Sequence, residues 1–267
     1  MREKLIAAAA LTLCALTAAV PVAAQDMMSH VDMNSPAMTK AEMTRAQVAA
    51  MAKAATPGHP VDFSGKALNG LDLSGLDLSG AIFRAASLNK AKLAGAKLDG
   101  AVLDQAWLLD ADLSHASLRR ANIFAAQMLR AKLDGADLSG ARLVSDLTNA
   151  SLVGAKLVGA RLGADMKNQS MGLMHAVLKS ANLDGADFHN ADLSRAELEF
   201  ASLKKTDLSG ASLLGADLSG ATLIDANIAG TDFEGADLAS ARLVAPVGLD
   251  AARNLDKAVN RDRMLRQ

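Results

Sequence analysis

The sequence predicts an all-β solenoid, in which one short structural unit is repeated along most of the chain. From Phe63 to Leu243, almost every fifth residue is leucine or another large apolar residue, and most glycines lie two residues after such a position. A period of five fits neither an α-helix, which has 3.6 residues per turn, nor a flat strand, which has two. Units of this kind stack on their neighbours and bury one continuous core.

The composition indicates that this core is narrow. Hydrophobic residues make up 51% of the 267 residues, yet aromatic residues make up 3% and tyrosine is absent. Alanine and leucine must therefore fill most of the interior. The formal net charge is -1 at pH 7, which provides no overall field to attract nucleic acid or a membrane surface. We expect neither as a partner.

Residues 1–24 are predicted to be a secretory signal peptide. Arg2 and Lys4 give it a basic start, residues 5–20 are apolar and rich in alanine, and small residues allow cleavage after Ala24. A transmembrane anchor is the alternative, but the apolar run is shorter than the roughly 20 residues that a span needs. We expect a periplasmic or secreted protein with no stable membrane insertion after the signal is removed.

Two segments separate the signal from the repeats. Residues 25–38 are polar and rich in methionine, which predicts a flexible arm. Residues 39–60 are predicted to form a helix and a linker. Thr39 and Glu42 have the spacing of a capping box, and the prolines and glycine of residues 57–60 would end the helix.

The repeats occupy residues 61–245, and their register is interrupted once. In residues 131–140 the unit reads alanine, a polar residue, leucine, and then two polar or small residues. The frame slips by one residue at Leu147 and is restored after residue 172. Such a break is either a functional site or a bulge that restores the register. We favour the bulge, with Met171 in an inward position, because residues 143–183 span two whole 20-residue lengths, so the two slips cancel.

A second helix is predicted over residues 246–267. Its apolar residues recur at helical spacing on one side, and arginines lie near its end. Together with the helix of residues 39–60, it would cover the open edges at the two ends of the solenoid. The residues on the apolar side are Leu249, Ala252, Leu255 and Val259.

The repeat unit resembles that of the pentapeptide-repeat family, loosely Ala-Asp/Asn-Leu-x-x, over residues 61–245. The resemblance implies a right-handed quadrilateral β-helix in which four units form one coil, or about nine coils here. It also implies that the central leucine and the alanine two residues before it point inward. Some members mimic DNA and protect gyrase, but that role needs a strongly acidic cytoplasmic protein, so the charge and the signal disfavour it.

Positions 20 residues apart become vertical neighbours in such a β-helix. One column alternates in charge and predicts a ladder of opposite charges, namely Asp72, Lys92, Asp112 and Lys132. Another column is uniformly acidic and would either hold a cation or basic partner or simply be solvated, namely Glu197, Asp217 and Asp237.

One outward surface is predicted to bind a protein partner or a second copy of the chain. Apolar patches on outward positions mark interaction sites, and tryptophan is common at interface hot spots. The alternatives are cover by another segment of this chain and scattered exposure without a role. The predicted residues are Ile82, Val102, Trp107, Leu109, Phe124, Leu129 and Val144.

A methionine and histidine cluster in the arm is the candidate metal site. Met27, Met28, His30 and Met33 place thioethers near an imidazole, and soft thioethers favour Cu(I) and Ag(I). Methionine is also an ordinary apolar gap filler, so a site without metal is the alternative. No other cofactor is indicated.

No enzyme site is indicated. The five histidines lack paired metal-ligand spacing, and the glycine-rich and nucleophile motifs of common enzymes do not stand out. Cys14, the only cysteine, would leave with the signal. The leading hypothesis is a non-enzymatic scaffold of the periplasm or exterior that binds a protein. An envelope protein for soft metals is the alternative, and a passive spacer is the third.

Overall fold

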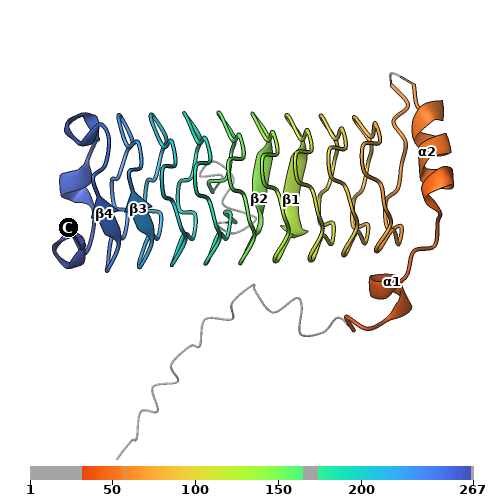
Figure 1. Ribbon diagram of the computed structural model, residues 1–267, viewed down its shortest axis with the longest axis horizontal. Helices are drawn as coiled ribbons and strands as arrows, with labels where there is room; N and C mark the ends of the chain where they lie inside the picture. Colours follow the sequence, from red (N-terminus) through yellow and green to blue (C-terminus); the bar gives the residue numbers. More distant parts are fainter. Residues whose placement is uncertain (1–31, 57, 165–173, 266–267) are drawn as a thin grey trace, which may run out of the picture. The chain divides into compact units, whose positions relative to one another are not determined.

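The computed structural model describes residues 32–56, 58–164 and 174–265. The chain divides into two compact units, residues 1–33 and residues 34–267. The second unit is a stack of coils with helix α2 at one end, and it contains every feature that follows unless another is named (Figure 1). Of the predicted flexible arm, residues 25–31 lie outside the described residues.

Parallel β-bridges join residues that are 20 positions apart. Asp62 pairs with Ile82, and the residues five, ten and fifteen positions further on repeat the pattern. Four bridges therefore close each 20-residue turn, so the coil has four sides. We call these sides A, B, C and D after their first bridged residues: Asp62, Ala67, Asp72 and Asp77.

The five-residue unit is explained by three local roles. The central leucine and the alanine two residues before it are buried, as at Leu113 and Ala111. The aspartate between them accepts a hydrogen bond from the backbone two residues on, as in Ser114 N to Asp112 Oδ1 at 3.0 Å. The corner residue has a positive φ, which glycine adopts without strain. At Gly135 (φ +65°) a Cβ would also lie 2.5 Å from the ring of His115.

The interruption of the register is not a compensated bulge, and that prediction was wrong. Before it, Arg142 pairs with Arg161, 19 positions on, and after it Asp146 pairs with Val177, 31 positions on. One residue is thus missing from one A–B corner, and eleven are inserted at the A–B corner of the next coil. Ala176 N donates to the carbonyl of Leu162 at 2.8 Å, the bond that closes an ordinary corner. Met171 lies outside the described residues.

A serine hydroxyl of the shortened corner completes the corner of the preceding coil. Strand β1 (Asn122–Gln127) pairs in parallel with β2 (Arg142–Asp146), with a register shift between Phe124 and Gln127. Buried Ser145 donates to the carbonyl of Ile123 at 2.7 Å and accepts from Ala126 N at 3.1 Å. The hydroxyl therefore bridges two backbone groups that bond each other directly at regular corners.

The N-terminal helix differs from the prediction in its start. Helix α1 (Pro36–Thr39) is followed by α2 (Arg45–Ala54), whose capping box is Thr44 with Gln47 rather than Thr39 with Glu42. The chain is extended between the helices, because Ala41 forms an antiparallel bridge with Leu68. Val48 of α2 is fully buried and belongs to the core, so α2 covers the first coil (Figure 1).

The predicted C-terminal helix is also wrong. The segment continues the β-helix, with Val247, Arg253, Val259 and Leu265 bridged to the preceding coil at steps of six residues. Each extra residue is absorbed in a short 3₁₀ turn that begins after a left-handed residue, Gly248, Asn254 or Asn260. These turns are η3 (Leu249–Ala251), η4 (Leu255–Lys257) and η5 (Arg261–Arg263), and the last full strands are β3 (Thr222–Ile224) and β4 (Arg242–Val244).

Candidate functional site

The predicted apolar residues do lie on two adjacent sides of the β-helix, A and B. Ile82 is bridged to Val102 on side A, and Phe124 of β1 pairs with Val144 of β2. Trp107 lies on side B, bridged to Ser87 and Gln127. The prediction needs correction at two positions, because Leu109 and Val144 are only 7% and 4% exposed. The others are half-buried, and we call these five residues the apolar face: Ile82, Val102, Trp107, Phe124 and Leu129.

Side B also holds a segment of the chain itself, through two stacked asparagines that the sequence reasoning missed. Asn69 Nδ2 donates to the carbonyls of Ala37 and Lys40, at 2.8 and 3.1 Å. Asn89 Nδ2 donates to the carbonyl of Met38 at 3.2 Å. Both side chains are buried, and each Oδ1 caps a backbone N–H of the next coil at 3.0 Å. Helix α1, predicted to be part of a flexible arm, is thereby fixed to side B.

The cover by α1 ends where the apolar face begins. Buried Met38 lies over Ser87, with its sulfur 3.6 Å from the hydroxyl. Ser87 is the direct neighbour of Trp107 in its column, and Asn89 precedes Leu109. Intramolecular cover, one of the alternatives, therefore accounts for the first two coils of side B and leaves Trp107 half-buried.

Two arginines border the apolar face on side A. The guanidinium of Arg142 lies 4.0 Å from the ring centroid of Phe124, in a cation–π contact. Arg142 is bridged to Arg161 in the next coil, and neither forms an ion pair with a described residue. Asn122 precedes Arg142 in the same column, and its buried Oδ1 has no hydrogen-bond partner among the described residues.

The charge ladder is aligned as predicted, but its neighbours do not pair as ions. The bridges stack Asp72, Lys92, Asp112 and Lys132 in order on side C. Hydrogen bonds from the backbone and hydroxyl of Ser74 hold the pKa of Asp72 below its ordinary value, and Arg45 adds an ion pair at 3.2 Å. These aspartates therefore serve the turn rather than the neighbouring lysines.

The acidic column is largely engaged within the protein. Burial acts to raise the pKa of Glu197, but hydrogen bonds from Lys179 and His175 outweigh it and leave the pKa lowered. Asp217 and Asp237 each accept a hydrogen bond from the backbone N–H two residues on, at 2.8 and 2.9 Å. Within the described ranges, no group of three or more His, Cys, Asp or Glu side chains is arranged to hold a metal.

The predicted soft-metal cluster is not brought together in the described part of the chain. Met27, Met28 and His30 lie outside the described residues, and Met33 belongs to the first unit. The structure therefore leaves Cu(I) or Ag(I) binding untested.

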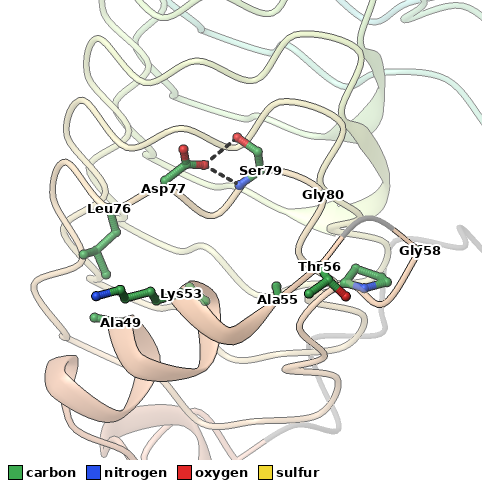
Figure 2. A pocket seen from close by; sticks show the side chains of 11 residues that line it. Ala49, Lys53, Ala55, Thr56, Gly58, Leu76, Asp77, Ser79 and Gly80 are labelled. Atoms are coloured by element: carbon green, nitrogen blue, oxygen red, sulfur yellow. Dashed lines mark hydrogen bonds between the residues drawn. The ribbon is translucent and has the colours of Figure 1, made fainter.

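A hollow of about 730 Å³ lies between α2 and the first coil (Figure 2). Its walls are mainly small residues, including Ala49, Ala52 and Gly80, with Lys53 at its edge. The carboxylate of Asp77 accepts hydrogen bonds from the backbone and the hydroxyl of Ser79, at 3.2 and 2.7 Å. These hydrogen bonds hold the pKa of Asp77 below its ordinary value, so its carboxylate is a weak base for the Ser79 hydroxyl. The described lining residues therefore do not form an activated nucleophile.

None of the helices in the described segments is long and apolar enough to cross a membrane.

Among the known protein families, the model of pentapeptide repeats matches this chain in eight copies, which cover more than half of it. The matched residues are 67–105, 96–127, 108–140, 126–163, 173–210 and 201–239. The gap between the matches coincides with the inserted segment. No curated protein matches the sequence significantly.

Several solved structures are similar to this chain. HetL from the cyanobacterium Nostoc sp. strain PCC 7120, a pentapeptide repeat protein involved in heterocyst differentiation regulation, is 28% identical over 82% of this chain and 98% of its own, with a TM-score of 0.48. QnrB1, a plasmid-mediated fluoroquinolone resistance protein, is 16% identical over 78% and 93%, with a TM-score of 0.37. A pentapeptide repeat protein of the Arabidopsis thaliana thylakoid lumen is 24% identical over 49% and 63%, with a TM-score of 0.23.

Proposed function

This chain belongs to the pentapeptide-repeat family, and from that premise we propose that it is a non-enzymatic scaffold that binds a protein partner through its apolar face. The fold of the family is the right-handed quadrilateral β-helix, which agrees with the four bridges per turn. The observation that carries the proposal is the group of half-buried apolar side chains on outward positions of sides A and B.

Outward positions of this fold do not need apolar residues. Most of them hold glycine, aspartate, asparagine, serine or lysine, and the core is already complete without them. Trp107, Val102 and Ile82 therefore do not stabilise the interior, and water contacts part of each side chain. A partner that removed this surface from water would gain roughly 25 cal/mol per Å² of apolar area. Tryptophan at the centre of such a surface is a frequent hot spot.

We further propose that the protein acts in the periplasm or outside the cell. This part rests on the basic start, the apolar run and the small residues of residues 1–24. A tagged full-length chain, fractionated and sequenced at its N-terminus, tests it. A cytoplasmic pool that keeps Met1 contradicts the proposal.

The binding proposal is tested by changing the apolar face without touching the core. The double variant Trp107→Ser, Leu129→Ser is compared with Phe200→Ser, which removes an aromatic side chain that is 71% exposed at a corner between sides B and C. Partners are crosslinked in the native envelope, and the oligomeric state is measured by light scattering. We expect the double variant to lose the crosslinked partner and Phe200→Ser to keep it.

Thermal melts of both variants show whether the fold is intact. If the double variant is folded, and neither its crosslinked products nor its oligomeric state differs from the wild type, the apolar face does not bind a partner.

A further inference from the structure

We propose that the partner bound at the apolar face is an acidic protein segment, whose carboxylates pair with Arg142 and Arg161. This inference rests on the proposed function and adds the chemistry of the partner. Two features carry it: an uncompensated pair of arginines beside the apolar face, and a contact that fixes one of them there.

The two arginines carry like charges in adjacent coils. Arg142 and Arg161 are bridged, so their backbones are separated by the spacing of neighbouring strands, about 4.8 Å. Like charges placed directly opposite each other are destabilising. Asp192 follows in the same column, but its carboxylate accepts the N–H of Ser194 at 2.9 Å and forms no ion pair among the described residues. The positive charge of the pair is therefore left for another molecule.

Phe124 holds Arg142 at the edge of the apolar face. The guanidinium lies over the ring, at 4.0 Å from its centroid, so its orientation is fixed before any partner arrives. Stacking on a ring leaves the N–H groups in the guanidinium plane able to donate, and they match a carboxylate in a two-bond geometry. Arg84, the nearest comparable arginine on side A, is instead matched by Asp104 at 3.8 Å. Unlike Arg84, neither Arg142 nor Arg161 pairs with a carboxylate among the described residues.

A polypeptide fits this surface better than a nucleic acid does. The apolar face requires apolar side chains, and the arginines require anions, a combination that acidic peptide segments supply. The net charge of the chain is -1, which gives no general attraction for a polyanion such as DNA. Residues 174–247 carry 11 acidic and 5 basic side chains. A second copy of this chain is therefore another source of carboxylates, and the experiment must distinguish it from a separate acidic partner.

The experiment selects a random library of short peptides on the purified full-length chain, and then measures the affinity of the enriched peptides. The test variant is Arg142→Glu, Arg161→Glu. The matched control is Lys92→Glu, Lys132→Glu, which makes the same change of net charge on side C. We expect enriched peptides to combine Asp or Glu with apolar residues. We expect their affinity to fall roughly tenfold in the test variant and less than about twofold in the control.

Raising the ionic strength from about 0.05 to about 0.5 M should weaken the same peptides, because it screens exposed charges. The inference is overturned if the enriched peptides show no bias toward Asp and Glu, or if the folded test variant binds them as the wild type does. In that case, loss of binding in Trp107→Ser, Leu129→Ser would still support the proposed function. If duplex DNA binds in a way that depends on Arg142 and Arg161, or if sedimentation shows a dimer that depends on them, the two arginines bind DNA or a second copy of the chain. Either result would also overturn the inference.

Discussion

Replacement of Asn89 by alanine tests how side B holds α1. The side chain is 6% exposed and makes two hydrogen bonds. Its Nδ2 donates to the carbonyl of Met38, and its Oδ1 accepts from Leu109 N. The variant leaves the buried N–H of Leu109 without an acceptor, which costs about 1–3 kcal/mol, and removes a second bond worth about 0.5–1.5 kcal/mol. We expect the free energy of unfolding to fall by about 1.5–4.5 kcal/mol.

The two bonds can be separated by a second substitution. Asn89→Asp keeps an acceptor for Leu109 N but replaces the donor with a carboxylate that faces the carbonyl of Met38. It should therefore release α1 while retaining more of the global stability. Asn182→Ala is the control, because Asn182 accepts only an exposed local bond, from Asp184 N at 3.1 Å.

Urea unfolding measures global stability, and the rate of tryptic cleavage after Lys40 measures the opening of α1. A loss of about 1 kcal/mol in docking raises the open population, and hence the cleavage rate, about fivefold. Both Asn89 variants should be cleaved faster than the wild type, and Asn182→Ala should not. If cleavage and unfolding of Asn89→Ala match the wild type, the asparagines do not hold α1.

Three further predictions concern other parts of the chain. Ser145→Ala should lower the free energy of unfolding by about 1–3 kcal/mol, because it removes the hydroxyl that bridges Ile123 and Ala126. The control Thr206→Ala should lower it by less than about 1 kcal/mol, since the carbonyl of Leu183 keeps its hydrogen bond from Ala186 N. Equal urea midpoints for the two variants would show that the Ile123–Ala126 corner closes without the hydroxyl. The pKa values of the turn aspartates are lowered in the fold, so these carboxylates stabilise the protein fully above the ordinary pKa of 3.8, and this stability is lost as pH falls through the folded values. A urea midpoint that already decreases near pH 6 would contradict this. A peptide of residues 25–55 should bind Cu(I) more tightly than a variant without methionine, and equal affinities in titration would exclude the metal alternative.

The coil could be predicted from the sequence because its inward positions tolerate few residue types. The central slots must hold large apolar side chains, and the slots two residues earlier need small ones, so the period is explicit in the chain. The interruption was misinterpreted for an arithmetical reason. Together, one missing residue and eleven inserted residues make a net insertion of ten, which equals two whole five-residue units. The five-residue frame of the sequence is therefore restored after the interruption. Only the residues that pair between neighbouring coils distinguish this arrangement from a bulge. That pairing is set by the tertiary structure and cannot be read from the period of the sequence.

The C-terminal segment was misassigned because its apolar residues satisfy two periods at once. Leu249, Ala252 and Leu255 fit a helical face, but they also fall within repeats of six residues. The distinguishing signal was present in the polar residues. Gly248, Asn254 and Asn260 recur every six positions, and these are the residue types that adopt the left-handed conformation most readily.

The apolar face could be predicted only in part, because exposure of an outward position depends on what lies over it. Alternation along the unit correctly assigns Trp107 and Leu129 to the surface, but it cannot show that Leu109 and Val144 are buried. The role of the asparagines was equally hidden. Asn69 and Asn89 conform to the polar pattern of the repeat, and only the position of α1 shows that their amides bind a backbone.

The outward columns of this β-helix can change residue type from coil to coil without affecting the core. On side B this freedom divides one surface into two parts. In the first two coils, the amides of Asn69 and Asn89 donate to carbonyls of the segment that contains α1. In the next two coils, Leu109 and Leu129 take the positions of these asparagines, beside Trp107. The boundary is well defined, because Asn89 itself caps the N–H of Leu109. The same side therefore holds the N-terminal segment of its own chain and leaves an adjacent apolar surface for the proposed partner.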